Sequence, residues 1–334
     1  MGAISLAYRV ETHRLSAPFR ISGFVFETSD VVVVELSDGE FTGRGEAAGV
    51  YYLGDDSAHI VAELEEHRDT IEGCSDREQL RQQMPRAGAR NAVDCAMWDL
   101  EAKRAGTDAR QLARIEDVRP LVTTFTLGAD EPEAMAEGAR RYTGARAIKV
   151  KLTGELGLDV RRVAAIRAAR PDVWLGVDAN QGFTRQDLDP LVDALSAHRV
   201  SLLEQPLRRG SEADLEGYRC PIPIAADESA LGLDDVEGLV GRFDVFNIKL
   251  DKCGGLTEAL LIVQEARRLG LGVMVGNMVG TSLAMAPAFI VGQHCDVVDL
   301  DGPTFLTHDR TPSCEYRDGT IWCANDVWGS RLAA

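Results

Sequence analysis

Charged residues recur at a regular interval in the middle of the chain, each at the end of a short apolar segment. They are Asp178 in WLGVD, Glu204 in SLLE, Asp227 in PIAAD and Lys249 in FNIK, separated by 26, 23 and 22 positions. One strand and one helix of a βα barrel together take about that length, and the C-terminal ends of barrel strands form a single rim. The spacing therefore predicts that three carboxylates and a lysine meet at one end of a parallel barrel.

Short apolar segments alternate with amphipathic helical patterns from about residue 122 onward, which is typical of βα units. The expected strands are TTFTLG, AIKVKL, WLGVDAN, VSLLEQP, IPIAADES, VFNIKLD, GVMVGN and DVVDLDG. The last two units contain less helical sequence than the others. A doubly wound sheet is the alternative, but the chain contains neither GxGxxG nor GxxxxGK[ST] to support a nucleotide-binding version of it.

The N-terminal part follows a different pattern, with strands first and helices afterwards. ISLAYRVETHRL, DVVVVELSDG and EFTGRGEA predict strands, with SDG as a hairpin turn. We expect one helix to begin with Ser57 as its N-cap and a second, Ala-rich helix to end at Gly106. This order predicts a compact α+β domain in residues 1–118.

Composition limits the functional classes open to the chain. A net charge of −17 argues against nucleic acid as a partner. No segment reaches the ~18 consecutive apolar residues that cross a bilayer, and the N-terminus lacks the pattern of a signal peptide. Seven cysteines, an odd number without a CxxC pair, predict free buried thiols in a reducing cytoplasm and not a disulfide framework.

Three carboxylates gathered in a buried site repel one another unless a cation lies between them. Asp178, Glu204 and Asp227 offer only oxygen atoms, and hard Mg²⁺ or Mn²⁺ prefers such ligands to the His and Cys that zinc or copper would take. The competing interpretation is that each acid caps the helix that follows it. Because the pattern repeats on three consecutive strands, we predict a divalent metal site.

The segment IKVKL places two lysines on one face of a strand. Lys149 and Lys151 alternate with apolar residues, so both side chains point the same way. Lys249 comes from a strand farther round the barrel and would approach the carboxylates from the opposite side. Neighbouring charges can lower the pKa of a lysine, and two bases on either side of one carbon can remove a proton from one face and return it to the other. The alternative is an ordinary amphipathic strand with lysines in solvent.

Together, IKVKL, GVDAN, LLEQP, AADES and NIKLDKCGG resemble the enolase superfamily, muconate-lactonizing subgroup. This resemblance extends over nearly the whole chain. It implies a (β/α)7β barrel, a modified TIM barrel, in residues 119–304. An α+β capping domain of residues 1–118, completed by the tail 305–334, would cover it. It also implies Asp178, Glu204 and Asp227 as Mg²⁺ ligands, Lys151 and Lys249 as the acid/base pair, and Lys149 beside the substrate carboxylate.

The motif DVVDLDGP narrows the resemblance to the dipeptide epimerases. Asp299 and Asp301 lie on one face of the last strand and, by this resemblance, hold the α-ammonium group of a dipeptide. A capping turn before Pro303 is the alternative. The resemblance further implies that Thr126 and Asn277 line the substrate pocket. It leaves the oligomeric state open, with a homo-oligomer as one candidate.

The loop SGFVFETSD departs from the L-Ala-D/L-Glu epimerases, which this chain otherwise resembles. Where those enzymes usually carry arginine for the side-chain carboxylate, this loop has Phe24 and Phe26, and Arg20 lies earlier. Burying an unpaired carboxylate is costly, so we expect an uncharged second residue, as in Ala-Ala or Ala-hydrophobic dipeptides. The alternatives are L-Ala-D/L-Glu, packing of the phenylalanines between domains, an N-acylamino acid racemase, a cycloisomerase or succinylbenzoate synthase, and a catalytically silent metal-binding protein.

Overall fold

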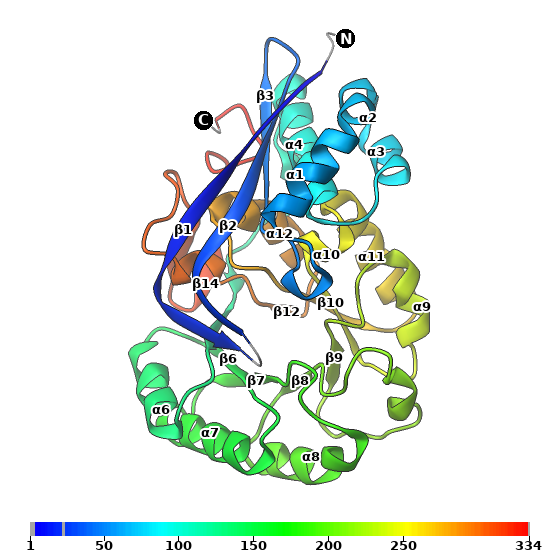
Figure 1. The fold of residues 1–334 in the computed structure, drawn as a ribbon. Coiled ribbons are helices and arrows are strands. Elements are labelled where there is room, and N and C mark those ends of the chain that lie inside the picture. The colour runs from blue at the N-terminus through cyan, green and yellow to red at the C-terminus, as the bar shows by residue number, and fades with distance from the viewer. Residues whose placement is uncertain (1–3, 22–23, 333–334) are drawn as a thin grey trace.

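The computed structural model describes residues 4–21 and 24–332, apart from the side chains of Ile21 and Phe24. Its N-terminal part is a three-stranded antiparallel sheet with helices packed on one face (Figure 1). The strands are β1 (Ser5–Ile21), β2 (Phe24–Ser37) and β3 (Thr42–Ala47). The central run Val31–Val34 is apolar at every position because alternate residues face two different cores. Val32 and Val34 pack under the capping helices, whereas Val31 and Val33 join the core shared with the barrel.

The helices of this part follow the predicted order, with one correction at the first N-cap. They are α1 (Ser57–Glu66), α2 (Arg68–Gly73), α3 (Arg77–Gln83), α4 (Gly88–Ala105) and α5 (Ala109–Leu112), preceded by the 3-10 turn η1 (Tyr51–Leu53). Asp56, and not Ser57, caps α1, because its side chain accepts a hydrogen bond from the backbone N–H of His59. Gly106 ends α4 with φ +65°, as expected.

Eight parallel strands form the barrel, and all eight lie in the predicted segments. They are β5 (Thr124–Leu127), β6 (Ala147–Lys151), β7 (Trp174–Asp178), β8 (Leu202–Glu204), β9 (Ile224–Ala226), β10 (Val245–Ile248), β11 (Gly272–Val275) and β12 (Val297–Val298). The helices around them are α6 (Pro132–Arg141), α7 (Leu156–Ala169), α8 (Leu188–Ala197), α9 (Val236–Leu239), α10 (Leu250–Cys253), α11 (Leu256–Arg268) and α12 (Ser282–Gly292). Hydrogen bonds from Leu300 to Thr123 and from Thr126 to Asp301 connect the two edge strands, so the barrel is nearly closed.

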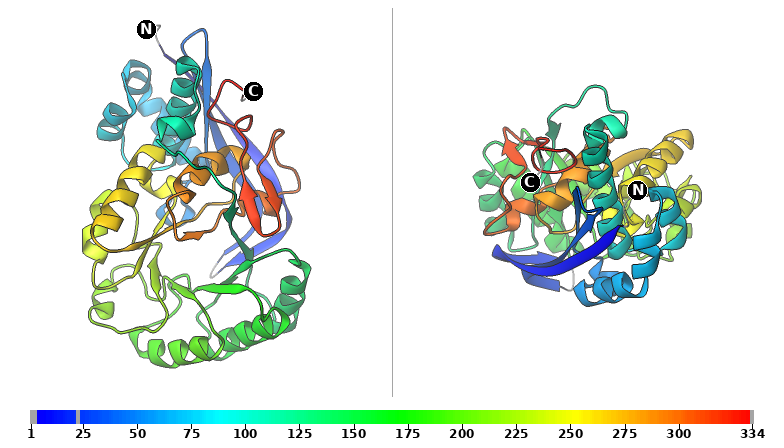
Figure 2. Two further views of the ribbon diagram at one scale, coloured as in Figure 1. Left: turned by 180° about the vertical axis from the view of Figure 1, so that it is seen from behind. Right: turned by 90° about the horizontal axis from the view of Figure 1, so that it is seen from above.

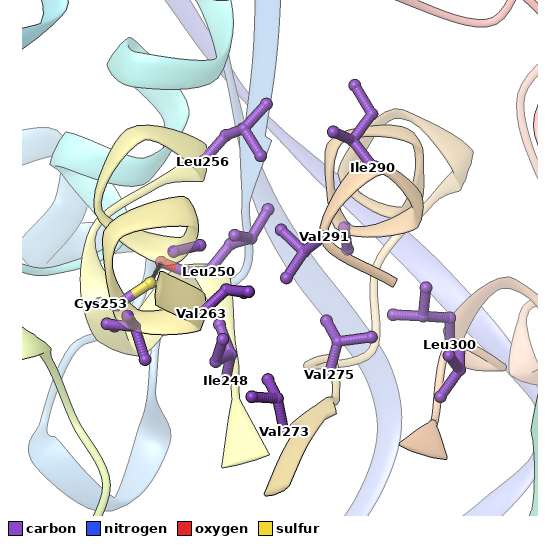
Figure 3. Packing of buried hydrophobic residues seen from close by; sticks show 14 of the residues in the cluster. Ile248, Leu250, Cys253, Leu256, Val263, Val273, Val275, Ile290, Val291 and Leu300 are labelled. Carbon is purple, nitrogen blue, oxygen red and sulfur yellow. Dashed lines mark hydrogen bonds between the residues drawn. The ribbon is translucent and has the colours of Figure 1, made fainter. Parts of the chain in front are cut away.

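The distribution of helices differs from the sequence expectation in one place. The last two units are expected to contain little helix, yet the connection between β11 and β12 contains the full helix α12. This helix is buried nearly all round and has Pro287 inside it, so it shows no amphipathic period. The short connection lies instead between β8 and β9, where only the 3-10 helix η3 (Glu212–Leu215) forms. In Figure 3, Val263 of α11 and Val291 of α12 lie near Ile248 of β10 and near Val273 and Val275 of β11.

The C-terminal residues run back from the barrel toward the N-terminal part (Figure 2). The strand β13 (Glu315–Arg317) pairs with β14 (Thr320–Trp322), which in turn pairs with β4 (Leu121–Val122) just before the barrel. Farther on, the Trp328 indole N–H donates to the carbonyl of Arg44 at 2.7 Å, and the Gly329 N–H donates to Asp99 at 2.9 Å. The tail therefore contacts the N-terminal sheet and α4 directly.

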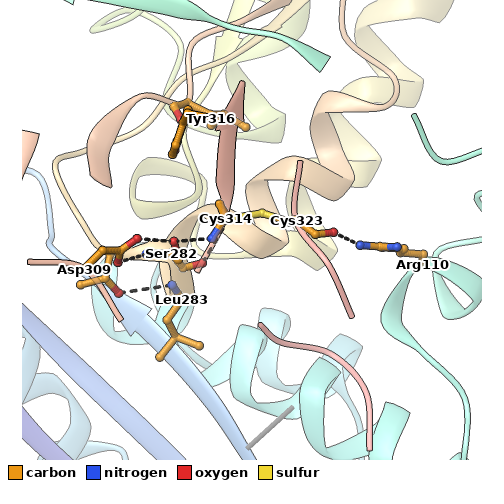
Figure 4. The surroundings of a disulfide bond; sticks show 9 residues. Arg110, Ser282, Leu283, Asp309, Cys314, Tyr316 and Cys323 are labelled. Atoms are coloured by element: carbon orange, nitrogen blue, oxygen red, sulfur yellow. Dashed lines mark hydrogen bonds between the residues drawn. A yellow bond between two sulfur atoms is a disulfide. The ribbon is translucent and has the colours of Figure 1, made fainter. Parts of the chain in front are cut away.

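The expectation that all cysteines are free thiols is wrong for one pair. Cys314 and Cys323 form a disulfide, with Cα atoms 4.5 Å apart, on either side of the β13–β14 hairpin (Figure 4). The pairing arises because the hairpin brings together two residues whose separation resembles no cysteine motif. Cys74, Cys95, Cys220, Cys253 and Cys295 are free, and all five are buried or partly buried. Within the described residues, no helix has the length and apolar character needed to span a membrane.

Candidate active site

Three buried carboxylates meet where β7, β8 and β9 end. Asp178, Glu204 and Asp227 are each at most 1% exposed, and one oxygen of each lies within 4.8 Å of the others. The parallel register sets Asp178 beside Glu204, and β9 brings Asp227 to the same rim. The strands are apolar up to these positions, so each charge falls where the strand leaves the core. The structure thus gathers the three predicted metal ligands in one place.

The lysines reach this cluster from two sides. Lys151 Nζ lies 2.6 Å from Asp178 Oδ2, and Lys249 Nζ lies 2.7 Å from Asp227 Oδ2. Lys149 lies deeper, with its Nζ 2.7 Å from Glu204, 2.8 Å from Asp299 and 3.2 Å from Asp178. In the order of the barrel strands, β6 and β10 are four places apart among eight, so Lys151 and Lys249 come from opposite walls.

Burial and neighbouring charges shift the pKa values of several groups in the cluster. Burial would raise the pKa of Asp178, but Lys151 and Lys149 outweigh it and hold that pKa at about 2. For Glu204, burial and the charge of Asp178 raise the pKa to about 7. Burial opposes the charged form of Lys249, yet Asp227 keeps its pKa above the ordinary value. The expectation that neighbouring charges lower the lysine pKa is therefore not met for Lys249 in the protein alone.

The charge balance of the cluster favours a divalent cation. Six carboxyl groups and four ammonium groups are buried around the rim, so the fully ionised cluster carries a formal charge of −2. The groups are Asp178, Glu204, Asp227, Glu228, Asp299 and Asp301, with Lys149, Lys151, Lys249 and Lys252. Burial and neighbouring carboxylates raise the pKa to about 8 for Glu228 and to about 7 for Asp301. These raised pKa values reflect burial and repulsion between the carboxylates. One divalent ion among the oxygen ligands would favour their ionised forms and balance the charge of −2, so the residues fit Mg²⁺.

A cavity of about 280 Å³ lies above the cluster, between the barrel rim and the N-terminal part. Lys151, Asn180, Asp227, Glu228 and Lys249 line it from the barrel. Its other walls are largely aromatic and apolar, and they include Leu15, Phe19, Phe26, Tyr51, Tyr52, Met278 and Val279. The two lysines thus face a space large enough for a small ligand, and the N-terminal part supplies its roof.

Asp299 and Asp301, which we call the DxD pair, follow β12 and adjoin the cluster. Asp299 accepts hydrogen bonds from Thr124 and Lys149, and Asp301 accepts one from the backbone N–H of Thr126 at 2.6 Å. Asn277 lines the cavity and donates to the carbonyl of Asp299. Among the described residues, Asp299, Asp301 and Thr126 are not in the cavity wall. The carboxylates of the pair are held by protein groups instead.

Of the two phenylalanines that the sequence assigns to the substrate pocket, the structure describes the side chain of one. Phe26 is half-buried, lines the cavity and has its ring centroid 5.3 Å from that of Tyr51. The side chain of Phe24 lies outside the part of the chain that the structure describes. Arg20 is exposed and is not among the described residues that line the cavity.

Sequence reasoning missed several residues of the site. Lys252 is fully buried, and its Nζ donates to the Asp227 carboxylate at 2.6 Å and to the Asp227 carbonyl at 2.7 Å. Its signal was the lysine three positions after Lys249 in KLDK, which one helical turn brings to the same site. Tyr51 and Tyr52 gave no signal, because a contact between η1 and the barrel leaves no local pattern.

Comparison with known families agrees with this geometry. Residues 133–324 match the enolase C-terminal domain-like family, and residues 3–113 match the mandelate racemase / muconate lactonizing enzyme N-terminal domain. The chain belongs to the enolase superfamily. Both the predicted family and the barrel with its separate N-terminal sheet are confirmed.

Curated relatives of this superfamily member are epimerases and racemases, so the chain is an isomerase. An L-Ala-D/L-Glu epimerase from Escherichia coli is 37% identical over 93% of this chain and 97% of its own length. An N-acetyl-D-glutamate racemase from Pseudoalteromonas sp. is 41% identical over 71% of this chain and 75% of its own. A hydrophobic dipeptide epimerase from Roseobacter litoralis is 35% identical over 90% and 91%, respectively.

A solved structure extends the likeness to the whole fold. An enolase family member from Agrobacterium tumefaciens, with homology to dipeptide epimerases and with sodium and L-Ala-L-Glu bound, has a TM-score of 0.93 and 38% identity. The match covers 98% of this chain and 100% of the other.

Proposed function

We propose that this protein is a Mg²⁺-dependent dipeptide epimerase that inverts the α-carbon of the second residue. The observation that carries the proposal is the placement of Lys151 and Lys249 on opposite walls of one cavity, beside a carboxylate triad. A carbon held between two amines can lose its proton to one and receive a proton from the other, which inverts its configuration. The epimerases among its relatives support the same reaction class.

In this mechanism Lys151 or Lys249 removes the α-proton, depending on which epimer is bound. The resulting enediolate carries its extra charge on the carboxylate oxygens of the substrate, and Lys149 provides a buried positive charge nearby. When bound by Asp178, Glu204 and Asp227, Mg²⁺ would supply further positive charge beside those oxygens. Added positive charge would also oppose the effect of Asp227 on Lys249 and bring its pKa down toward the range of a base.

The second residue of the substrate is uncharged in our proposal, with Ala-Ala or Ala-hydrophobic dipeptides preferred. Among the described cavity residues, the only lysines or arginines are Lys151 and Lys249, and both are committed to catalysis in this mechanism. Glu228 adds a carboxyl group to the same wall. A substrate glutamate would bring a second carboxylate without a free cation, whereas Phe26 offers apolar contact.

L-Ala-D/L-Glu is the second candidate. It is favoured by the named activity of the Escherichia coli relative and by the L-Ala-L-Glu bound in the Agrobacterium tumefaciens structure. The N-acetyl-D-glutamate racemase relative likewise makes N-acylated substrates a necessary comparison.

The test is a panel of Ala-Ala, Ala-Leu, Ala-Glu and N-acetyl-Ala-Ala, incubated in D₂O and followed by mass spectrometry for deuterium at the α-carbon. We expect exchange with epimerisation for Ala-Ala and Ala-Leu, complete loss of it with EDTA, and recovery with Mg²⁺. Full activity in a demonstrably metal-free preparation would reject the metal assignment, and a panel without any exchange would reject the reaction. The division at residues 118 and 305, the cytoplasmic location, replacement of Mg²⁺ by Mn²⁺ and a homo-oligomer stay predictions.

A further inference from the structure

Three buried side-chain oxygens on the cavity wall have no hydrogen-bond partner among the residues that the structure describes: the Tyr52 hydroxyl, Glu228 Oε2 and Asn180 Oδ1. The hydroxyl can donate as well as accept, whereas Asn180 Oδ1 and an ionised Glu228 Oε2 can only accept. Glu228 is only 3% exposed, and the side chains of Glu228 and Asn180 line the cavity next to the carboxylate triad. A buried polar atom without a partner costs about 1–3 kcal/mol, so two such acceptors facing one cavity point to a ligand that donates hydrogen bonds.

Glu228 and Asn180 are both close in sequence to proposed metal ligands of the triad. Glu228 directly follows Asp227, and Asn180 lies two positions after Asp178, with its backbone N–H 3.0 Å from Asp178 Oδ1. Asn180 and Gln181 have φ angles of +43° and +64°, in the left-handed region that non-glycine residues seldom adopt. Strained backbone of this kind persists where the surrounding structure requires it, typically at functional sites. The turn therefore holds the Asn180 carboxamide at the cavity wall.

We propose that Glu228 Oε2 and Asn180 Oδ1 accept hydrogen bonds from water molecules bound to the metal ion of the triad. This inference rests on the metal site of the proposed function. Mg²⁺ takes six ligands and usually keeps several waters, and three carboxylates do not fill its coordination. Water on a cation is a hydrogen-bond donor, and an ionised carboxylate or a carboxamide oxygen can only accept. Glu228 and Asn180 are thus positioning residues that act on the cation through its water.

The charge of Glu228 adds to this role. With a divalent ion bound, its ionised carboxylate would be part of the formal charge of −2 that the ion balances in the buried cluster. Replacing it by glutamine removes one negative charge and keeps one acceptor oxygen, whereas leucine removes both. At Asn180, leucine removes the acceptor, whereas aspartate keeps it. The two sites therefore separate the contribution of charge from that of hydrogen bonding.

The experiment is calorimetric titration of the EDTA-stripped full chain with Mg²⁺, without dipeptide. Groups that hold metal ligands from the outside typically change metal affinity 10- to 100-fold when replaced. We expect Glu228→Leu and Asn180→Leu each to raise the Mg²⁺ Kd by about that factor. Glu228→Gln should raise it by less, and Asn180→Asp should keep or improve it. Glu212→Gln is the matched control, because Glu212 is partnered by Gly210 and Ser229 and lies outside the cavity wall.

Electron paramagnetic resonance of the Mn²⁺-loaded protein in ¹⁷O-labelled water gives a second readout that a purely structural role would not change. Broadening by bound water should diminish in the leucine variants and persist in Asn180→Asp. If circular dichroism shows that a leucine variant does not fold, the Mg²⁺ affinities of Glu228→Gln and Asn180→Asp are compared with that of the unsubstituted protein instead. Mg²⁺ affinities unchanged in the folded variants would overturn the inference, as would a change confined to the KM of the dipeptide. An unsubstituted protein that binds no Mg²⁺ would instead overturn the proposed metal site.

Discussion

Asp251 connects the roof of the cavity to the catalytic rim, and its replacement by asparagine should stabilise the protein at pH 8. The carboxylate lies on α10, two positions after Lys249, and its Oδ1 accepts the backbone N–H groups of Ala48 and Gly49 at 3.0 Å each. These residues lead directly into η1, which carries Tyr51 and Tyr52. Asp251 is 6% exposed, and its burial raises its pKa to about 7.

The direction of the stability change with pH follows from proton uptake by Asp251 on folding. An aspartate in the unfolded chain has a pKa of about 4, so between about pH 4 and pH 7 the folded protein holds a proton that the unfolded chain releases. The stability due to this proton is fully present below pH 4 and is lost as the pH rises through 7. Three pKa units correspond to about 4 kcal/mol, as an upper bound for Asp251. Asparagine keeps the acceptor and has no charge to bury, so this loss should be absent.

Asp251→Ala is the contrasting variant. It leaves two buried N–H groups without their acceptor, which costs about 1–3 kcal/mol each at every pH. The loosened roof should also raise the KM of the dipeptide. Urea unfolding of the three proteins in EDTA at pH 5 and pH 8, followed by circular dichroism, measures the free energies of unfolding. The reasoning fails if Asp251→Asn is less stable than the unsubstituted protein at pH 8, or if their difference does not change between the two pH values.

Three further predictions concern the reaction itself. Lys151→Ala and Lys249→Ala should both lose epimerisation, with residual α-proton exchange in D₂O for opposite epimers, and the same preference in both would contradict the two-sided arrangement. If Asp299 and Asp301 take the α-ammonium group, as the resemblance implies, N-acetylation of the dipeptide should lower kcat/KM at least ~10-fold. Neither carboxylate lines the cavity in the structure, so unchanged kcat/KM would remove both from substrate binding. Phe26→Arg should shift kcat/KM toward Ala-Glu at least ~10-fold relative to Ala-Leu, about 1.4 kcal/mol, whereas the control Val25→Arg, exposed on the other face of β2, should not.

The barrel and the site rim could be predicted because their signals are local. Each of the strands β7, β8 and β9 is apolar up to a charged residue at its end. That residue therefore indicates both where the strand ends and which side chain lies at the rim of the barrel. The helix α12 escaped detection because burial on nearly all sides removes the period of 3.6 residues on which the expectation depends. The Cys314–Cys323 pair was missed because only the pairing of β13 with β14 brings these cysteines together.

Individual contacts between the N-terminal part and the barrel could not be predicted. The hydrogen bonds of Asp251 with Ala48 and Gly49 span about two hundred residues of sequence. No periodicity links the two segments, and only the docking of the N-terminal part on the barrel creates the contact. The same holds for Tyr51 and Tyr52, whose place in the cavity depends on that docking.

The contacts of the tail have a consequence for synthesis on the ribosome. Trp328 and Gly329 bond to Arg44 and Asp99, so the last part of the chain completes a surface that begins in the first hundred residues. Translation proceeds at about 5–20 residues per second, and a domain usually folds once its own residues have emerged. Here the N-terminal sheet must wait for the intervening barrel to be translated before these contacts can form. The Arg44 carbonyl and the Asp99 carboxylate therefore lack these two hydrogen bonds until the end of the chain has been made.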